Sequence, residues 1–338
     1  MASMTSVVRV LRDNRAGSIT HTVWQKRIYL WLPSPAPGVQ SGGEEEDGMD
    51  TAKQKRIDGL ICGLLGVAIF SGSLPATRVA VADLSPLFLT GARAVIAAAL
   101  AGLVLLATRQ ARPDRRDLMS LAVIAVGVVV GFPLLSALAL QHMTSARSIV
   151  FIGLLPLSTA IFGVMRGGER PRPLFWLFSG LGSATVIGFA FSSHDDGAWT
   201  SDLLMLASIV ICGLGYAEGG ILARRLGGWQ VICWALVLSA PIMLVVAALD
   251  LPADWSAIGA PAWSGLAYVS VFSMLIGFIF WYRGLAMGGI ASVGQLQLLQ
   301  PFFALALAGL VLHEAVPWTM VAAAALTVAS VAVARRYA

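Results

Sequence analysis

The sequence has few charged residues. Asp, Glu, Lys and Arg make up 12% of its 338 residues, about half the share of an average soluble domain, whereas 57% of the residues are hydrophobic. A soluble fold of this size cannot bury that much apolar surface, so the composition indicates a polytopic membrane protein. The net charge of +5 does not indicate nucleic acid as a partner, because the basic residues lie in short loops between apolar stretches.

Cysteine and histidine are also scarce. Cys62, Cys212 and Cys233 fall inside apolar stretches and lack the spacing of a disulfide framework or a metal site. The four histidines are dispersed, and no glycine-rich phosphate loop of the Walker type occurs. We therefore expect no metal and no other cofactor, and we do not expect ATP to drive the protein.

The first 56 residues differ in composition from the rest. They are mostly polar, and we predict that residues 1–56 form a tail without stable structure. Met49 is followed by Asp-Thr-Ala-Lys-Gln-Lys-Arg, which is typical of the short basic leader of a membrane protein. The acidic run 45–48 before it is encoded by purine-rich codons, as a bacterial ribosome-binding site is. Met49 is therefore a candidate for the native start.

Ten apolar stretches follow the tail. Each has about 20 residues, the length that a helix needs to cross a hydrocarbon core of about 30 Å. A segment inside lipid must satisfy its own backbone hydrogen bonds, so we expect an all-α fold with ten transmembrane helices. The predicted spans are 59–80, 86–107, 118–139, 145–165, 173–192, 203–222, 229–249, 262–282, 291–311 and 316–334.

Loop charges predict the orientation of these spans. The connections on one side carry 15 basic residues, and those on the other side carry only Arg78 and Arg147. Because cytoplasmic loops are enriched in Lys and Arg, we expect both termini in the cytoplasm and the protein in a bacterial inner membrane. The 15 residues are Lys53, Lys55, Arg56, Arg109, Arg112, Arg115, Arg116, Arg166, Arg170, Arg172, Arg224, Arg225, Arg283, Arg335 and Arg336.

Two stretches 145 positions apart repeat the same pattern. Pro156 maps onto Pro301, and Glu169 maps onto Glu314, without a gap. Each copy contains five predicted helices, an odd number, so the second copy would enter the membrane from the opposite side. The sequence thus predicts two inverted five-helix repeats, at 57–193 and 202–338, an arrangement typical of alternating-access transporters.

Several short segments carry a family resemblance that extends from Ile57 to Arg336. They are Pro86–Arg93, Ala139–Gln141, Leu154–Pro156, Gly168-Glu169, Tyr216–Gly220, Arg224–Gln230, Gln300-Pro301 and His313-Glu314. In order and spacing these segments resemble the drug/metabolite transporter superfamily, EamA type. The resemblance implies two five-helix bundles around a central cavity and the movement of small metabolites such as amino acids.

The ninth predicted span holds the best candidates for substrate binding. Gln295, Gln297 and Gln300 are costly in hydrocarbon unless they are paired, so they should not all face lipid. Their amides could hydrogen-bond a polar solute, or they could instead bond neighbouring helices. Pro301 and its counterpart Pro156 each free a backbone carbonyl near the midplane, which predicts either a hinge or a plain packing kink.

Charged and aromatic residues supply further candidates. Glu218 is a carboxylate well inside a span, and it could bind a substrate amine, carry a coupling proton, or pair with Arg224 or Arg225 in a gate. Tyr216 lies close to it and is a second candidate. The resemblance raises Trp281 to a cavity or gate candidate, although aromatic residues are ordinary at membrane interfaces. Arg147 either meets anionic groups or anchors a helix end.

Arg93 lies about 10 Å below the predicted outer surface by helical rise. Snorkelling, or pairing with another helix, is the expected role, in preference to substrate binding. The second copy has Leu238 in its place, so whatever Arg93 does is not duplicated.

We conclude from the sequence that the protein is a secondary transporter and not an enzyme. It would export small polar or amphipathic metabolites, such as amino acids, by alternating access. The expected partners are the lipid bilayer, the metabolite and a coupling proton, with no nucleic acid, and a homodimer stays open. The rival functions are an intramembrane enzyme acting on a lipid or lipid-linked substrate, and a channel-like facilitator.

Overall fold

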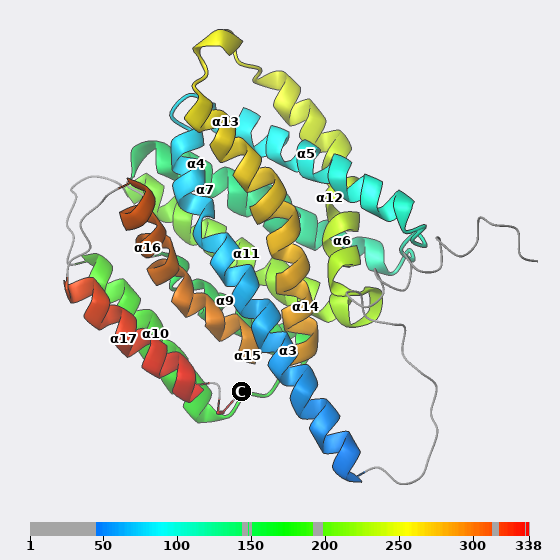
Figure 1. Ribbon diagram of the computed structural model, residues 1–338, viewed down its shortest axis with the longest axis vertical. Coiled ribbons are helices and arrows are strands. Elements are labelled where there is room, and N and C mark those ends of the chain that lie inside the picture. The colour runs from blue at the N-terminus through cyan, green and yellow to red at the C-terminus, as the bar shows by residue number, and fades with distance from the viewer. Residues whose placement is uncertain are drawn as a thin grey trace, which may run out of the picture. The chain divides into compact units, whose positions relative to one another are not determined.

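The computed structural model describes residues 45–143, 148, 151–191, 199–312, 318–334 and 336–337, and the secondary structure in these ranges is helical (Figure 1). The chain divides into two units, Met1–Glu46 and Asp47–Ala338. Everything described below, apart from the first two residues of the first helix, lies in the second unit.

The first half of the chain contains the helical segments α3 (Glu45–Ser71), α4 (Ser73–Ala80), α5 (Pro86–Ala107), α6 (Asp117–Ile124), η1 (Ala125–Gly131), α7 (Phe132–His142), α9 (Leu155–Gly167) and α10 (Pro173–Phe191). The second half contains α11 (Trp199–Leu226), α12 (Gly228–Leu249), η2 (Trp255–Ala257), α13 (Ala260–Ala267), η3 (Tyr268–Gly277), α14 (Phe278–Gly288), α15 (Ile290–Gly294), η4 (Gln295–Leu299), α16 (Gln300–Leu312) and α17 (Trp318–Ala334).

Six helices of the described residues are long and apolar enough to cross a membrane. They are Lys53–Ala80, Pro86–Ala107, Asp117–His142, Trp199–Leu226, Gly228–Leu249 and Ala260–Gly288. These six coincide with six of the ten spans predicted from the sequence. The other four predicted spans contain α9, α10, the run from α15 to α16, and α17, and their crossing of the membrane stays a prediction.

The tail prediction differs from the structure in one respect. Residues 45–56, predicted to lack stable structure, belong to α3. The Gln54 amide donates to Asp58 at 2.9 Å, a bond with the i to i+4 spacing of a helix.

Both halves contain a π-helical segment at corresponding places. In the first half it is η1, inside the span Asp117–His142, and in the second it is η3, inside Ala260–Gly288. Adding 145 to the bounds of η1 gives 270–276, which falls within η3. Such wide turns are rare and often mark functional sites, so their recurrence extends the sequence repeat to a local feature of the backbone.

The second helices of the two halves, α5 and α12, pack side by side and run antiparallel. The Gln230 amide approaches the Gln110 oxygen at 3.5 Å at one end of the pair. At the other end, a methyl group on Gly91 would lie 2.6 Å from the backbone nitrogen of Ala247. The sequence order of the contacts is thus reversed between the two helices.

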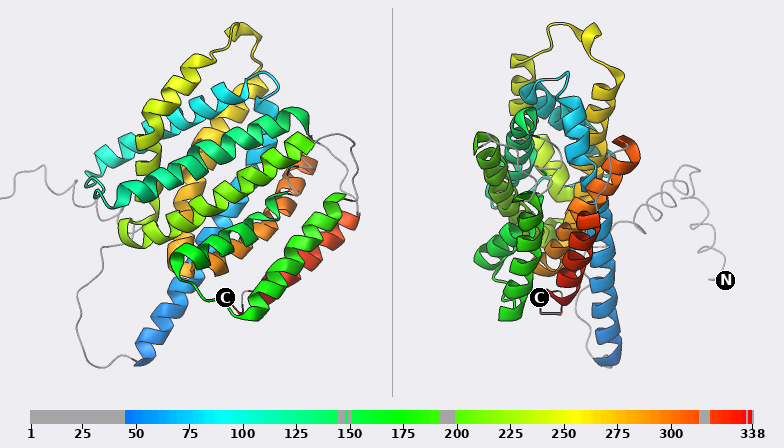
Figure 2. Two further views of the ribbon diagram at one scale, coloured as in Figure 1. Left: turned by 180° about the vertical axis from the view of Figure 1, so that it is seen from behind. Right: turned by 90° about the vertical axis from the view of Figure 1, so that its left-hand side faces the viewer.

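The fifth helices of the two halves, α10 and α17, form a similar pair (Figures 1 and 2). The Arg172 nitrogen donates to the Tyr337 oxygen at 3.0 Å, and a methyl group on Gly182 would lie 3.5 Å from Ser330 Cβ. The ring of Phe178 stacks on that of Tyr337 at 6.1 Å. This pair is antiparallel as well.

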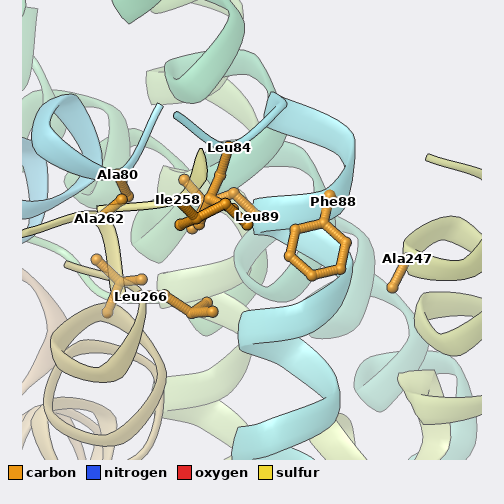
Figure 3. Packing of buried hydrophobic residues seen from close by; sticks show 9 residues of the cluster. Ala80, Leu84, Phe88, Leu89, Ala247, Ile258, Ala262 and Leu266 are labelled. Atoms are coloured by element: carbon orange, nitrogen blue, oxygen red, sulfur yellow. The ribbon is translucent and has the colours of Figure 1, made fainter. Parts of the chain in front are cut away.

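Apolar side chains close one end of the bundle (Figure 3). Leu84, Phe88 and Leu89, at or just before the start of α5, belong to one cluster with Ile258, which precedes α13, and with Ala262 and Leu266 of α13. The Asp83 carboxylate accepts a hydrogen bond from the Gly259 nitrogen at 2.9 Å in the same region. Loop charge predicts that this is the outer end.

Glycines allow α3 and α14 to approach closely. A methyl group on Gly284 would lie 2.8 Å from the Gly63 nitrogen and 2.9 Å from the Gly59 oxygen, and one on Gly59 would lie 2.6 Å from the Gly288 nitrogen. Backbone atoms cannot move aside as a flexible side chain can, so these positions exclude larger residues. Small residues of this kind are common where membrane helices pack.

We expect Gly284→Ala to destabilise the protein by about 1–3 kcal/mol, the usual cost of inserting a methyl group into a packed interface. The measurement is the thermal unfolding midpoint in detergent. Gly180→Ala is the matched control, because a methyl group there meets no atom within 4 Å. Equal midpoints for the two variants would contradict the close approach of α3 and α14.

Candidate functional site

The ninth predicted span is not a continuous α-helix. It is built from α15, the tighter 3₁₀ segment η4, and α16, with Pro301 at the second residue of α16. Because proline has no N–H, it cannot bond the carbonyl of Gln297 in the way an α-helix requires. A 3₁₀ stretch inside a helix often marks a hinge, so the backbone here is suited to bending.

The three predicted glutamines lie in or next to this break, and all are buried. Gln295 and Gln297 are 0% exposed, and within the described part of the chain neither amide has a hydrogen-bond partner for its nitrogen or its oxygen. The Gln300 nitrogen makes one long bond, to the Phe70 oxygen at 3.4 Å, and the Gln300 oxygen has no partner. Unsatisfied buried amides are uncommon and costly, which favours a ligand-facing role over interhelical bonding.

The structure separates Gln295 from the other two glutamines. In a 3₁₀ helix residues three apart lie on the same side, so Gln297 shares a side with Gln300, and Gln295 shares one with Leu298. Leu298 packs toward Gly182 of α10, whereas Gln300 reaches Phe70 of α3. Gln297 and Gln300 therefore lie on the side of this segment that faces α3, and Gln295 lies on a different side.

Five aromatic residues form a cluster beside Gln300. The rings of Tyr216, Phe278 and Trp281 contact Phe70, the residue whose carbonyl Gln300 contacts. The ring of Tyr282 contacts Phe278. Tyr216 lies 5.3 Å from Trp281 between ring centroids, and the Trp281 indole nitrogen is buried without a partner. Trp281 is 0% exposed, so it does not belong to an aromatic belt at the lipid surface.

The fourth predicted span is interrupted at the counterpart of Pro301. A turn at residues 153–154 precedes α9, and Pro156 is the second residue of α9. The Gly153 carbonyl, beside the break, accepts a hydrogen bond from the Ser183 hydroxyl at 3.1 Å. Proline in a first helical turn needs no backbone donor, so the interruption leaves Pro156 unstrained. Its role as a hinge stays a prediction.

Glu218 is buried in α11 and has two partners. Arg166 of α9 donates to its carboxylate at 3.0 Å, and Ser120 of α6 donates at 2.6 Å. An ion pair of Glu218 with Arg224 or Arg225 was one of the roles considered from the sequence, and the structure pairs Glu218 with Arg166 instead. Those two arginines lie six and seven residues farther along α11, and they pair with carboxylates on other segments.

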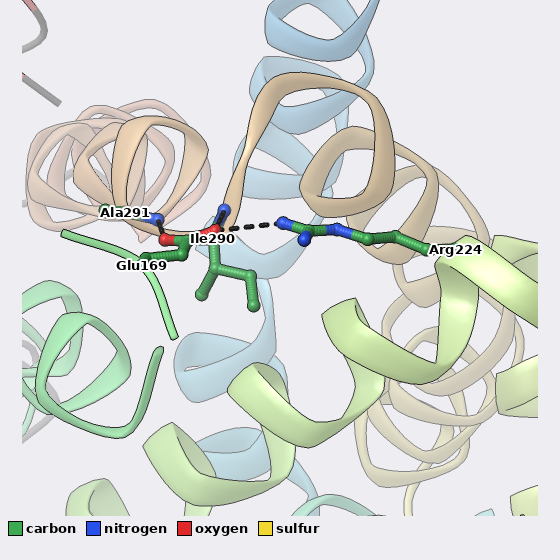
Figure 4. Close-up of polar contacts among 4 residues, drawn as sticks. All are labelled: Glu169, Arg224, Ile290 and Ala291. Atoms are coloured by element: carbon green, nitrogen blue, oxygen red, sulfur yellow. Dashed lines mark hydrogen bonds and ion pairs between the residues drawn. The ribbon is translucent and has the colours of Figure 1, made fainter. Parts of the chain in front are cut away.

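Arg224 pairs with Glu169 at 2.9 Å (Figure 4). The Glu169 carboxylate also accepts hydrogen bonds from the backbone nitrogens of Ile290 and Ala291, at 2.9 and 2.8 Å. Gly168 makes this possible, because its φ of +65° ends α9 with a left-handed turn. Glu169 thereby joins α9, α11 and the start of α15.

Arg225 pairs with Asp117 at the start of α6, and Asp117 is buried. The Arg225–Asp117 pair and the two ion pairs described above lie at one end of the bundle, which we call the ion-pair end. Its residues are Asp117, Ser120, Arg166, Glu169, Glu218, Arg224 and Arg225. These contacts link α11 to α6, α9 and α15 at the end opposite the apolar cluster of Figure 3. Loop charge predicts that the ion-pair end is cytoplasmic.

The structure does not bring all of the predicted site residues together. Arg147 and Glu314 lie outside the described residues. Tyr216 and Glu218 are two apart on α11, and they contact different neighbours, the aromatic cluster and the ion-pair end. Phe70 of the aromatic cluster and two residues of the ion-pair end, Arg166 and Asp117, were not predicted as site residues from the sequence. Arg166 and Asp117 look like ordinary loop charges, and no periodic signal distinguishes Phe70 from packing residues.

These features define a helical membrane protein with unpaired polar groups beside a helix break. A family model described as the EamA-like transporter family matches residues 57–191 and 199–336. The chain belongs to this family. It is therefore a multi-pass membrane protein and a transporter, as the resemblance of its motifs predicted.

Relatives agree with this assignment. The chain is 64% identical over 284 residues to "Uncharacterized transporter YdeK" of Bacillus subtilis (strain 168), covering 84% of this chain and 99% of that protein. It is 25% identical over 267 residues to "Uncharacterized transporter sll0355" of Synechocystis sp. (strain ATCC 27184 / PCC 6803 / Kazusa), covering 73% of this chain and 80% of that one. A solved structure described only as "Crystal structure of protein" has a TM-score of 0.69 at 20% identity, covering 83% of this chain and 99% of that chain, which supports the fold alone.

Proposed function

We propose that the protein is an alternating-access carrier built from ten transmembrane helices in two inverted five-helix repeats. It would export small polar or amphipathic metabolites, such as amino acids, across a bacterial inner membrane, with both termini in the cytoplasm. The antiparallel packing of equivalent helices carries this proposal. Helices related by the 145-residue offset, α5 with α12 and α10 with α17, pair in opposite directions, as an axis within the membrane plane requires.

The contacts also repeat in the way that a pseudo-twofold axis predicts. Gly91 approaches Ala247, and the offset converts this pair into Leu236 and Gly102. A methyl group on Gly102 would lie 3.8 Å from a Val237 methyl, one residue from the expected partner. The two halves can therefore exchange equivalent interfaces, which is the physical basis for opening one side while closing the other.

Gln297 and Gln300, with Trp281 and Tyr216 beside them, form the proposed solute site. The amides offer both donors and acceptors, and the aromatic rings offer apolar contact, so the site suits a solute with both characters. The helix break before Pro301 provides the bend that opening would need. The ion-pair end would be the cytoplasmic gate, closed in this structure by Glu218, Glu169 and their arginines.

The partners of Glu218 help to choose among its three possible roles, which are a gate residue, a binding group for a substrate amine and a carrier of a coupling proton. Glu218 has a cation and a hydroxyl donor already, so we favour the gate over direct binding of a substrate amine. A coupling proton on Glu218 is the alternative that an experiment must separate. A gate carboxylate breaks its ion pair when the helices move, whereas a proton carrier makes the transport rate depend on pH through this residue.

Solute counterflow in proteoliposomes tests the proposal whatever the direction of transport or the coupling ion. Vesicles loaded with an unlabelled neutral amino acid are diluted into the radiolabelled form, over a panel of such amino acids. We expect transient, saturable accumulation of the label for at least one member, absent from protein-free vesicles. Non-saturable flux without accumulation would indicate a channel, and chemical conversion of the solute would indicate an enzyme. Either result, or no protein-dependent flux for any member, would contradict the proposal.

A further inference from the structure

Arg93 is a buried cation that is ion-paired with no carboxylate among the described residues. Its side chain on α5 is 3% exposed, and its Nε has no hydrogen-bond partner. An unpaired charge inside a helical bundle is costly, so such a residue marks a functional site unless another group neutralises it.

Among the residues that the structure describes, neither snorkelling nor an ion pair with another helix is seen for Arg93. A snorkelling arginine keeps its head at the surface, and Arg93 does not. An ion pair with a neighbouring helix needs an acid. The described segments that pack most closely against α5, namely α12, η3, α7, α13 and η1, contain neither Asp nor Glu. The protein thus supplies no anion from these segments.

A second unsatisfied polar group lies on the same side of α5. Thr90 is 1% exposed, and its hydroxyl has no partner. Because residues three apart on a helix are neighbours, this hydroxyl and the Arg93 guanidinium can serve one ligand. A hydroxyl and a guanidinium are both donors, which is the combination that binds a carboxylate.

The position of Arg93 fits one end of a small solute. It lies seven residues after Pro86 at the start of α5, on the order of 10 Å from the predicted outer end. Gln300 lies twelve residues before Leu312 at the end of α16, on the order of 18 Å from the same end. By the same rise per residue the two positions differ in depth by on the order of 8 Å.

We infer that Arg93, with Thr90, is the seat for the carboxylate of the transported solute, and that the substrates are zwitterionic or anionic organic acids. The solute's apolar and polar remainder would extend toward Gln300 and the aromatic cluster. The inference rests on the proposed carrier function. The second half has Leu238 at the equivalent position, and that side chain is 43% exposed, so the pathway has one such seat, in its predicted outer half.

Competition in the counterflow assay tests the inference. Each unlabelled amino acid of the panel and its carboxamide, which lacks the negative charge, compete with the labelled amino acid. For the wild-type protein we expect the carboxylate form to compete about 10- to 100-fold better, the range for a charge-assisted hydrogen bond. Arg93→Gln should lose this preference, and Arg93→Lys should keep part of it. Arg78→Gln, which alters an exposed arginine at the same end, is the control and should change nothing.

The outcomes separate the two proposals. A wild-type protein that exchanges both forms equally well, or an Arg93→Gln variant that keeps the preference, overturns the carboxylate seat and leaves the carrier intact. A wild-type protein that exchanges neither form contradicts the carrier function and therefore also the carboxylate-binding role of Arg93. If Arg93→Gln does not fold, Thr90→Val decides the question. This near-isosteric variant should weaken carboxylate competition several-fold and leave carboxamide competition unchanged, and equal effects on both forms would overturn the seat.

Discussion

Replacing Gln297 with Leu should reduce transport by about 10- to 100-fold while leaving the thermal stability unchanged or raised. The transport loss is the expected cost of a solute polar group that is left without its partner in a buried site. The stability result follows from the same observation. The Gln297 amide is fully buried and has no hydrogen-bond partner among the described residues. A leucine of similar volume therefore removes a polar group whose desolvation cost is not offset by a hydrogen bond.

Two measurements on the same sample test this prediction: the initial rate of counterflow and the unfolding midpoint in detergent. Gln110→Leu is the matched control, since Gln110 lies at the end of α5 and pairs with Gln230. That variant should transport normally. A structural Gln297 that holds two helices together would give the reverse pattern for Gln297→Leu, with a lower midpoint. A destabilised variant, or a stable one with full transport, would remove Gln297 from the solute site.

Glu218→Gln should open the ion-pair end. The substitution keeps the size of the side chain but removes the charge that Arg166 pairs with across α9 and α11. A neutral amide holds an arginine less tightly than a carboxylate does, so the population with an open cytoplasmic side should increase. The reporter is a cysteine at Leu222, one turn from Glu218 and 2% exposed, in a background without the native cysteines.

We expect a maleimide added from the cytoplasmic side to label this cysteine about tenfold faster in Glu218→Gln, which corresponds to a shift of about 1.4 kcal/mol between the two states. Asp254→Asn is the control, because Asp254 is an exposed carboxylate in the loop before α13 and contacts Ser256. Unchanged labelling in Glu218→Gln would rule out the gate. The pH dependence of counterflow then distinguishes the alternative, since a proton carrier would lose that dependence in Glu218→Gln and a gate residue would not.

The sequence predicted the helices better than their contacts. Hydrophobic length alone located the six long apolar helices, because a span needs about 20 apolar residues whatever it packs against. The starts of α5 and α17 were anticipated to within a few residues for the same reason. The π-helical segments η1 and η3 were not anticipated, since they depend on how two helices pack and carry no composition signal.

In the candidate site, too, the sequence predicted single residues better than their contacts. Gln297 and Gln300 stood out because an amide in an apolar span needs an explanation. Among the described residues the Gln297 amide has no hydrogen-bond partner, and Gln300 makes only one long bond, to the Phe70 oxygen. Sequence distance suggested Arg224 or Arg225 as one possible partner of Glu218, whereas the actual partner, Arg166, comes from a segment 52 residues away. Arg93 was judged by its depth alone. That the described neighbours of α5 offer it no acidic partner depends on the packing of the helices, which the sequence does not reveal.

The inverted repeat itself has a direct test. Ala111 lies in the loop after α5, and Ser256 lies 145 residues later in the loop after α12, and both are exposed. Single cysteines at these two positions are labelled in intact cells with a maleimide that does not cross the membrane. The account predicts that Ser256→Cys is labelled from outside and that Ala111→Cys reacts only after the cells are opened. Labelling of both positions from the same side would contradict the inversion, and the alternating-access mechanism that depends on it.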